Sequence, residues 1–332
     1  MRLTRRAALT GLGAVALPRA AGAVEQTRFP ISVSVRPISG FQLGNRERQR
    51  FGKLQFRGGL VLSSGHPRFG GFSGLARLNE GRDLVSVTDR GYWLTARVLS
   101  QGGKPVGLDD AAMAAVLGFS GRPLASGGVY DLESLCIADG VAYVGIERQH
   151  QIMRFDWAGQ GVEARGRPVP VPAPIKRLPR NRGLEAIGVV PSGPLRGALI
   201  AISERSGKED EPTLGAILGG SSPGLFQVAR HDGYDITDLA FLPSGDMLLL
   251  ERWYQPLRGV GMRIRRIAGR DIRPDALVDG ERLIEADLGY EIDNMEGLSV
   301  HLEQGRTVLT LISDDNFSFI QRTVLLEFEL LA

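Results

Sequence analysis

Acidic side chains recur at matching positions of a repeated sequence pattern, an arrangement that could hold a hard metal cation. Each copy of the pattern contains two strand-like stretches, and the acids lie where the first stretch begins or where the second stretch ends. They are Glu133, Glu185 and Glu296 at the beginnings, and Asp89, Glu147, Glu204, Glu251 and Asp314 at the ends. Crowded carboxylates repel one another and take up protons unless a cation lies among them. Their oxygen ligands suit calcium better than zinc, which prefers histidine and cysteine.

We therefore expect Ca²⁺ to be the cofactor of this site. The expected ligands are Glu133, Glu185 and Glu296, supplemented by Asp89, Glu147 or Glu204. A cation held there would polarise an ester oxygen and acidify a water molecule, so Glu185 and Glu204 are also candidate catalytic residues. His150 comes three residues after the acid Glu147 and is a candidate general acid or base. The other histidines show no metal-binding spacing.

An arginine directly follows four of the strand-end acids. These arginines are Arg90, Arg148, Arg205 and Arg252. A guanidinium group matches the oxygens of a phosphate bidentately, so the four could bind a small anionic ester substrate. Alternatively, they could bridge to acids of the neighbouring unit and form a salt-bridge network that fixes how the units pack. The acids that begin the first stretches have no adjacent arginine, which favours a binding site over a purely structural network.

The two-part pattern occurs five times and predicts an all-β propeller. Its first stretches lie around Leu75, Leu135, Ile187, Leu239 and Leu298, spaced roughly 50 to 60 residues apart. Short β-type stretches separated by turns such as Pro243-Ser244-Gly245-Asp246 are typical of propeller blades. The strands 56–62 and 323–330 belong to no complete unit, and we expect them to pair into a composite blade that closes the ring. This predicts a single propeller of six blades, with five as the alternative.

The propeller would bring the acids together. The innermost strand of a blade lines the central channel and the next strand returns antiparallel to it. The start of the first strand and the end of the second therefore lie on one face. We expect the acids to meet at the mouth of the channel on that face.

Three longer insertions follow strand ends that carry acids. They are 101–128, which includes a helix predicted over 109–117, and then 162–181 and 206–223. Long connections are commonly lids or binding loops, so we expect them beside the channel mouth.

Bulk properties exclude several classes of protein. Residues 1–23 resemble a twin-arginine export signal, with Arg5 and Arg6 before an apolar stretch and small residues up to Ala23. Without this segment, which we expect to be cleaved, 36 basic side chains face 37 acidic ones, so the chain offers no basic patch for nucleic acid. No later apolar run is long enough for a membrane span. We expect a periplasmic or secreted monomer whose single domain covers 24–332, and whose lone Cys136 forms no internal disulfide.

Sequence signatures of several enzyme classes are missing. The chain has no Gly-x-Ser-x-Gly motif of serine hydrolases, no phosphate-binding loop and no dinucleotide fingerprint. Covalent catalysis by an activated serine and nucleotide-dependent chemistry therefore find no support, whereas metal-assisted chemistry does.

An ordered set of short motifs resembles the phytase-like family, which is described as having esterase-like activity. The motifs are GGFSGL at 70–75, VTDRG at 87–91, DLESL at 131–135, NRGLEA at 181–186 and NMEGL at 294–298. The resemblance implies a secreted or periplasmic β-propeller that hydrolyses phosphate or carboxylic esters. On this basis we expect a metal-assisted ester hydrolase that acts on phosphate esters. A lactone or carboxyl-ester hydrolase using the same site, and a non-catalytic propeller that binds a ligand or partner, are the alternatives.

Overall fold

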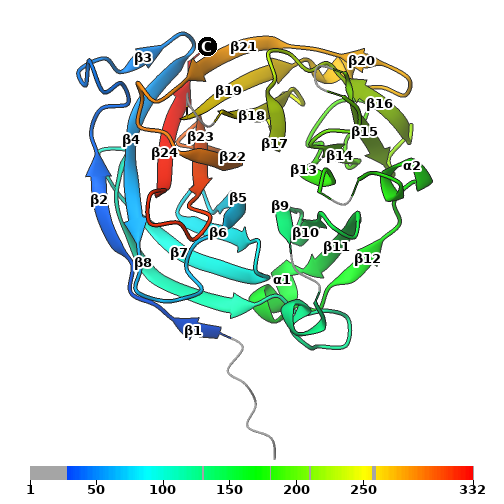
Figure 1. Cartoon of the computed structure of the whole chain (residues 1–332), viewed down its shortest axis with the longest axis horizontal. Coiled ribbons are helices and arrows are strands. Elements are labelled where there is room, and N and C mark those ends of the chain that lie inside the picture. The colour runs from blue at the N-terminus through cyan, green and yellow to red at the C-terminus, as the bar shows by residue number, and fades with distance from the viewer. Residues whose placement is uncertain (1–27, 129–130, 180, 209–210, 256–258, 332) are drawn as a thin grey trace, which may run out of the picture.

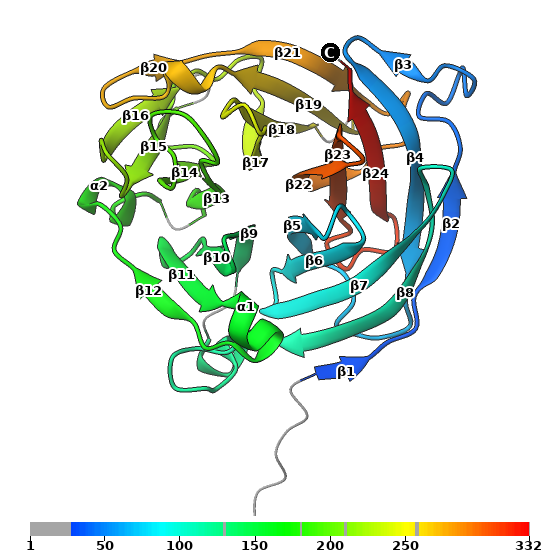
Figure 2. The same cartoon turned by 180° about the vertical axis from the view of Figure 1, so that it is seen from behind.

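The described residues fold into five sheets arranged around a central channel, antiparallel except for the parallel pair β16 and β20 (Figures 1 and 2). A computed structural model describes residues 28–128, 131–179, 181–208, 211–255 and 259–331. The expected export signal at 1–23 lies outside this range. The fold is therefore a β-propeller, as the repeat predicted, but with five blades.

Each blade begins with an innermost strand beside the channel and continues outward. Blade 1 contains β5 (Phe72–Leu78), β6 (Asp83–Thr88), β7 (Tyr92–Gln101), β8 (Lys104–Ala115) and β1 (Arg28–Pro30). Blade 2 contains β9 (Leu132–Ala138), β10 (Val141–Ile146), β11 (Gln151–Asp156) and β12 (Arg167–Val169). Blade 3 contains β13 (Leu184–Val189), β14 (Leu199–Ser203), β15 (Thr213–Leu218), β16 (Gly224–Val228) and β20 (Leu277–Val278).

Two further blades complete the ring. Blade 4 contains β17 (Asp235–Phe241), β18 (Met247–Gln255), β19 (Gly259–Ile267) and β21 (Glu281–Ala286). Blade 5 contains β22 (Asn294–Glu303), β23 (Arg306–Asp314), β24 (Thr323–Leu330), β4 (Leu54–Ser63) and β2 (Ser34–Ile38), with β3 (Arg50–Phe51) paired to β4. The helices are short: α1 (Trp157–Gln160), α2 (Ala173–Lys176) and the 3₁₀ turns η1 (Leu124–Gly127), η2 (Gly161–Glu163) and η3 (Gly269–Asp271). In the part of the chain that the structure describes, no helix has the length and hydropathy needed to cross a membrane.

The predicted pairing of the first and last parts of the chain is confirmed, whereas the predicted sixth blade is wrong. Strand β24 pairs with β4, Leu325 facing Leu60, but its other edge pairs with β23, Leu325 facing Ile312. Both terminal strands therefore extend the fifth sheet and supply its outer layers. Both edges of β24 and both edges of β4 are paired within this sheet, so these two strands cannot form a separate blade.

Packing between neighbouring blades closes the ring. Each innermost strand contacts the next in the order β5, β9, β13, β17, β22 and back to β5. Five hydrophobic clusters fill the five interfaces between adjacent blades; for example, Trp93 of blade 1 and Val144 of blade 2 are fully buried in one cluster. Apolar burial of this kind is the main favourable term in folding, and here it also fixes the angle between blades.

The helix predicted over 109–117 is wrong, because this segment forms most of strand β8. Its alanines are flanked on both sides: Ala112 pairs with Thr95 of β7 and with Pro30 of β1. Small side chains fit between two strands of a packed sheet, so tertiary pairing overrides the helix propensity of alanine.

The three insertions supply little of the predicted cover over the channel mouth. Segment 101–128 contains β8, and segment 206–223 contains β15. The third, 162–181, contains β12 and α2 along the outside of blade 2, and Asn181 at its end reaches the central cavity. These segments are therefore largely outer parts of blades.

One buried carboxylate ties blade 4 to blade 5 at the channel. Asp238 is fully buried and accepts hydrogen bonds from the backbone nitrogen of Leu239, at 2.8 Å, and from that of Leu298 on β22, at 2.7 Å. An acceptor at this point satisfies a backbone donor that would otherwise be buried without a partner.

Replacing Asp238 with alanine should destabilise the propeller. The Leu298 donor would lose its acceptor, which costs about 1–3 kcal/mol in free energy of unfolding. Urea unfolding of Asp238→Ala measures this loss, with Asp271→Ala at an exposed turn as the control. Equal stability of the two variants would contradict the proposed link between the blades.

Candidate functional site

A β-bulge occurs near the start of every innermost strand, and in three blades it positions a glutamate at the channel mouth. In blade 3, Leu184 faces Ser203 but Ala186 faces Ile202, so Glu185 has no residue opposite it. The same irregularity occurs in the other four blades. The five bulged residues are Ser73, Glu133, Glu185, Thr237 and Glu296. A bulge re-aims side chains locally, and here it does so at the same place around the ring.

A second set of side chains comes from equivalent positions at or near the end of the second strand of each blade. In blades 1 to 3, this residue donates its backbone N–H to the residue just before the innermost strand, for example Glu204 to Gly183 at 2.9 Å. In blades 4 and 5, the corresponding residues face each other in the strand ladder. The five equivalent residues are Asp89, Glu147, Glu204, Arg252 and Asp314. Four blades thus present an acid at this position, and blade 4 presents an arginine.

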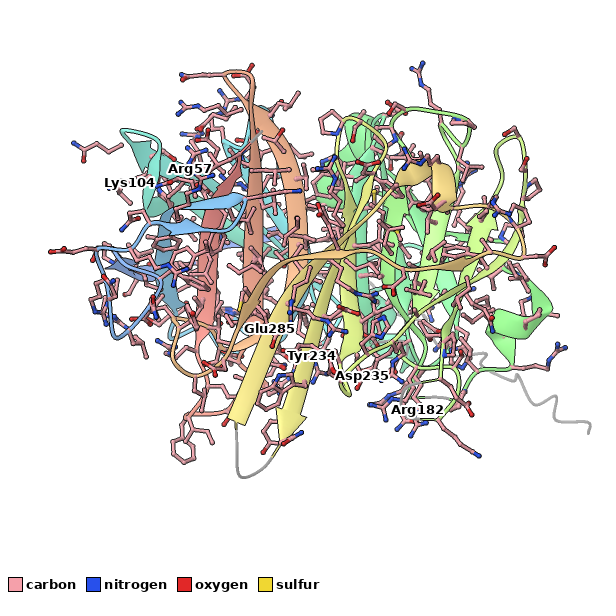
Figure 3. The ribbon with its side chains drawn as sticks, turned by 90° about the horizontal axis from the view of Figure 1, so that it is seen from above. Arg57, Lys104, Arg182, Tyr234, Asp235 and Glu285 are labelled. Atoms are coloured by element: carbon pink, nitrogen blue, oxygen red, sulfur yellow. The ribbon has the colours of Figure 1, made fainter. Side chains whose placement is uncertain are left out.

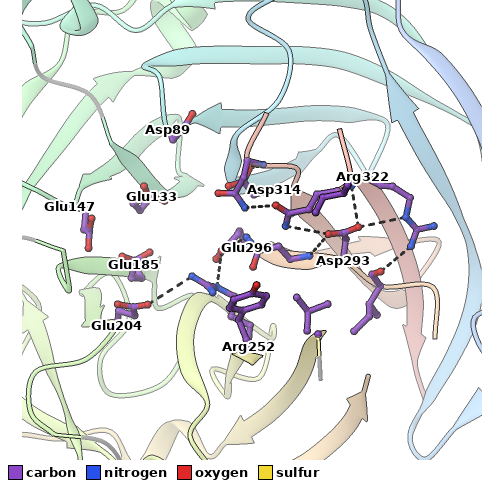
Figure 4. Close-up of a pocket in the computed structure, with 18 of the residues that line it drawn as sticks. Asp89, Glu133, Glu147, Glu185, Glu204, Arg252, Asp293, Glu296, Asp314 and Arg322 are labelled. Atoms are coloured by element: carbon purple, nitrogen blue, oxygen red, sulfur yellow. Dashed lines mark hydrogen bonds and ion pairs between the residues drawn. The ribbon is translucent and has the colours of Figure 1, made fainter. Parts of the chain in front are cut away.

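Apart from Ser73 and Thr237, both sets of side chains border one cavity of about 820 Å³ at the channel mouth (Figure 4). Its lining includes the acids Asp89, Asp131, Glu133, Glu147, Glu185, Glu204, Asp293, Glu296 and Asp314, with Arg252 and Arg322. Edge-on, Asp235 and Arg182, which lie at or just before the starts of β17 and β13, point to the same end of the ring, away from Arg57 and Lys104 (Figure 3). The strand starts therefore gather on one face, as the sequence predicted.

Two groups of carboxylates in this cavity have the spacing of a metal site. The oxygens of Asp131, Glu133 and Glu147 lie within 4.8 Å of one another, and so do those of Glu147, Glu185 and Glu204. Glu147 belongs to both groups. It also accepts a hydrogen bond from the backbone nitrogen of Gly183 at 3.2 Å, which holds it between blades 2 and 3.

Glu296 lies apart from these two groups, and an arginine balances its negative charge. The Nε atom of Arg252 lies 2.7 Å from its Oε1 atom, and Asn294 donates a hydrogen bond to the same oxygen at 2.8 Å. Another nitrogen of Arg252 lies 3.9 Å from Glu204. Arg252 therefore stands between the carboxylate groups and the acid of blade 5.

Burial raises the pKa of the cavity carboxylates. It raises the pKa of Asp89 to about 6 and, with repulsion from Asp235, that of Glu204 to about 7. Burial also raises the pKa of Asp314 to about 8, despite the hydrogen bond from the Asn316 backbone.

Among the two carboxylate groups, Glu133 and Glu185 have the most strongly raised pKa values. Burial, followed by repulsion from neighbouring acids, raises the pKa values of Glu133 and Glu185 well above the ordinary range. The pKa of Glu147 is raised for the same main reason. Burial and repulsion therefore favour the protonated forms of these groups unless positive charge lies beside them.

Of the four predicted substrate-binding arginines, Arg252 lines the cavity and the other three do not. Arg148 pairs with Asp131 at 2.6 Å, and Arg205 pairs with Asp235 of the next blade at 2.5 Å. Arg90 lies over the ring of Phe317. Arg205 and Arg252 thus form the inter-blade bridges that were the structural alternative, and Arg252 combines this with access to the cavity.

Two further expectations are changed by the geometry. Glu251 does not reach the channel mouth, because it lies one position before Arg252 and points to the opposite face of β18. It is fully buried and contacts Arg263 at 2.5 Å and Arg265 at 2.6 Å.

His150 does not line the cavity either; its Nε2 atom donates to the carbonyl of Leu178 at 2.7 Å. This bond anchors the loop after α2, and the geometry gives no support to a role for His150 in proton transfer.

Asp131 is a candidate site residue that the sequence analysis did not single out. It precedes β9 and has a positive φ of 81°, a conformation that aspartate tolerates better than most residues. Its counterparts before the other innermost strands are Gly71, Gly183, Asp235 and Asn294. Only Gly, Asp or Asn occupies this position in the five repeats, which could have marked it in the sequence. The position was missed because it lies outside the apolar stretch that was used to align the repeats.

Comparisons with known proteins give the family. No curated protein matches the sequence. Among solved structures, a nidogen/laminin complex matches with a TM-score of 0.40 and 10% identity over 84% of this chain and 88% of that one. The PQQ-bound aldose sugar dehydrogenase of Streptomyces coelicolor matches with a TM-score of 0.41 and 12% identity over 90% and 99%. Glutaminyl cyclase of Myxococcus xanthus matches with a TM-score of 0.41 and 10% identity over 79% and 92%.

These structural likenesses are too distant to carry a functional argument. A family model, in contrast, matches residues 67–317 and is described as "Phytase-like: Esterase-like activity of phytase". The matched segment contains every bulged residue and every strand-end residue of the cavity. Because it spans most of the sequence, the chain belongs to the phytase-like family named for the esterase-like activity of phytase.

Proposed function

We propose that this protein is an exported ester hydrolase that acts on phosphate esters with the help of a bound divalent cation, which we expect to be Ca²⁺. The observation that carries the proposal is the meeting of two carboxylate groups, joined by Glu147, in one cavity beside Arg252. Membership in a family named for esterase-like activity of phytase agrees with ester hydrolysis in general terms. The proposal also places the protein in the periplasm or outside the cell, as a monomer.

The donor chemistry of the cavity fits calcium. Both carboxylate groups offer oxygen atoms alone, without histidine or cysteine, and calcium takes six to eight oxygen ligands in flexible geometry. Burial and mutual repulsion raise the pKa values of Glu133 and Glu185, so a cation would relieve a real electrostatic penalty. The residues that would hold it are Asp131, Glu133, Glu147 and Glu185, which leaves Glu204 beside the cation site. A bound divalent cation supplies positive charge that polarises a phosphoryl oxygen and acidifies water.

The chain itself supplies two further functions. Arg252 is fixed by Glu296 and can donate its remaining N–H groups to an oxygen of the phosphoryl group. Glu204 lies next to Arg252 and has a pKa of about 7, so both of its protonation states are populated at neutral pH. This suits Glu204 to accept a proton from the attacking water or to return one to the leaving group.

Replacing Glu185 with glutamine should remove activity and leave the fold intact. The substitution keeps the shape of the side chain but removes the charge shared by one carboxylate group, so we expect kcat/KM to fall on the order of 100-fold or more. The measurement is turnover of phosphate monoesters and short acyl esters with calcium and with a chelator, alongside thermal unfolding. Glu163→Gln, at an exposed turn of blade 2, is the matched control.

The same assay separates the proposal from its alternatives. Calcium-dependent turnover of acyl esters or lactones alone would make the protein a carboxyl-ester hydrolase. Turnover of neither class, with or without calcium, would favour a propeller that binds a ligand or partner. Full activity of Glu185→Gln would contradict the assignment of this residue.

Calcium should stabilise the protein more at pH 8 than at pH 5. The raised pKa values mean that the folded protein binds more protons than the unfolded chain between pH of about 4 and the folded values. Without metal, stability contributed by Glu133, Glu147 and Glu185 is therefore lost as pH rises from about 4 towards their raised pKa values. Calcium binds the deprotonated form, so its effect grows over the same interval.

Thermal unfolding at both pH values, with calcium and with chelator, checks this expectation. The quantity to compare is the calcium-induced change in Tm, because it cancels the pH dependence of groups elsewhere in the protein. A change that is equal at both pH values, or larger at pH 5, would argue against these carboxylates as the ligands.

A further inference from the structure

One wall of the same cavity is apolar, and the proposed reaction does not account for it. The wall is formed by Tyr254, Val260, Leu288, Ile292 and Ile320. These residues come from the β18–β19 ends of blade 4, the connection from β21 to β22, and the loop after β23. The carboxylate groups that could hold a cation come from blades 2 and 3 instead. The cavity is therefore charged on one side and apolar on the other.

Local structure holds this wall in place. Tyr254 and Val260 face each other across the β18–β19 pair, so their side chains lie on the same face of the sheet. Leu288 lies against Gly259, where a Cβ atom would come within 2.4 Å of its Cδ1 atom. Gly259 also has a φ of +87°, which favours glycine. This glycine lets Leu288 lie against the hairpin.

The wall leaves large apolar side chains in contact with solvent. Tyr254 is 64% exposed, Leu288 is 54% exposed and Ile320 is 75% exposed, while Ile292 is buried. Exposed apolar side chains that line a cavity together with polar groups are typical of ligand-binding grooves. A ligand that covered these side chains would gain the free energy of removing them from water.

The charges of the cavity disfavour a substrate with many phosphate groups. Nine acidic side chains and two arginines line the cavity within the described part of the chain. Of the arginines, Arg322 is already paired with Glu291 and Asp293, and Arg252 with Glu296. Even with a cation on each carboxylate group, little positive charge would remain for additional phosphates. One ester phosphate with an uncharged substituent suits this charge distribution better.

We propose that the substrate is a phosphate ester of an apolar alcohol, whose alkyl or aryl group lies on the wall formed by Tyr254, Leu288 and Ile320 while its phosphate lies between Arg252 and the carboxylate groups. This inference rests on the proposed function and specifies its substrate class. A cavity of about 820 Å³ is large enough for both parts of such a molecule.

Hexyl phosphate and glycerol phosphate test the inference, because they carry the same phosphate on an apolar and a polar alcohol. We expect kcat/KM to be about tenfold higher for hexyl phosphate. The double variant Tyr254→Ser/Leu288→Asn should raise KM for hexyl phosphate about tenfold with kcat unchanged, since the lost contacts are uniform binding, and should leave glycerol phosphate unaffected. Both positions are exposed, so the fold should tolerate the changes.

Leu277→Asn is the matched control. Leu277 is 59% exposed, similar to Leu288, but lies on β20 at the outer edge of blade 3, away from the cavity. Its substitution should change neither substrate. If glycerol phosphate or an inositol polyphosphate is turned over as well as hexyl phosphate, the inference is overturned and the proposed function stands.

A binding measurement keeps the two proposals separable. Hexylphosphonate and methylphosphonate have no ester bond to hydrolyse, and calorimetry in calcium gives their Kd values without turnover. An absence of turnover together with about tenfold tighter binding of hexylphosphonate, lost in the double variant, would refute the hydrolase and support the apolar subsite. Equal Kd values for the two phosphonates would refute the subsite.

Discussion

The strongest constraint on this molecule is the extra residue that each innermost strand carries relative to its partner. The bulge occurs at the same register position in all five blades. In blades 2, 3 and 5 it turns a glutamate towards the channel mouth, next to the residue near the end of the second strand. The propeller places the blades around an axis, and the bulges decide which side chains meet there. Without them, Glu133, Glu185 and Glu296 would alternate with the regular pleat of their strands.

The pseudo-fivefold arrangement is broken in a way that matters for chemistry. Blades 2 and 3 present glutamate at both the bulge and the strand end, whereas blade 4 presents Thr237 and Arg252. Blade 4 also provides Tyr254 and Val260, which form part of the apolar wall. A symmetric ring of acids would be a poor receptor for any anion. Replacement of the acids in one blade creates a polarised cavity from a repeated scaffold.

The sequence predicted the strands better than it predicted their partners. The five innermost strands and the returning strands were found because apolar stretches and turns repeat, and most of the cavity acids came with them. Glu251 was misassigned because the repeats were aligned on their acidic residues, whereas the structural equivalent of Glu204 is Arg252, one position later. Neighbouring residues of a strand point to opposite faces, so an error of one position places the side chain on the wrong face. Asp131 was missed because it precedes its strand. The number of blades depends on which strands pair with β24, and the strand conformation of residues 109–115 depends on pairing with β7 and β1. Local propensity encodes neither pairing.

The closure of blade 5 has a consequence for how the chain reaches its folded state. Strands β2 and β4 come early in the sequence, yet they form the outer layers of a sheet whose inner layers, β22 to β24, come last. Contacts between such distant segments carry a large loop-closure entropy and are associated with slow folding. Until β24 docks, β4 has an unpaired edge that could join to another chain. The last strand of the sequence therefore protects one of the first from aggregation.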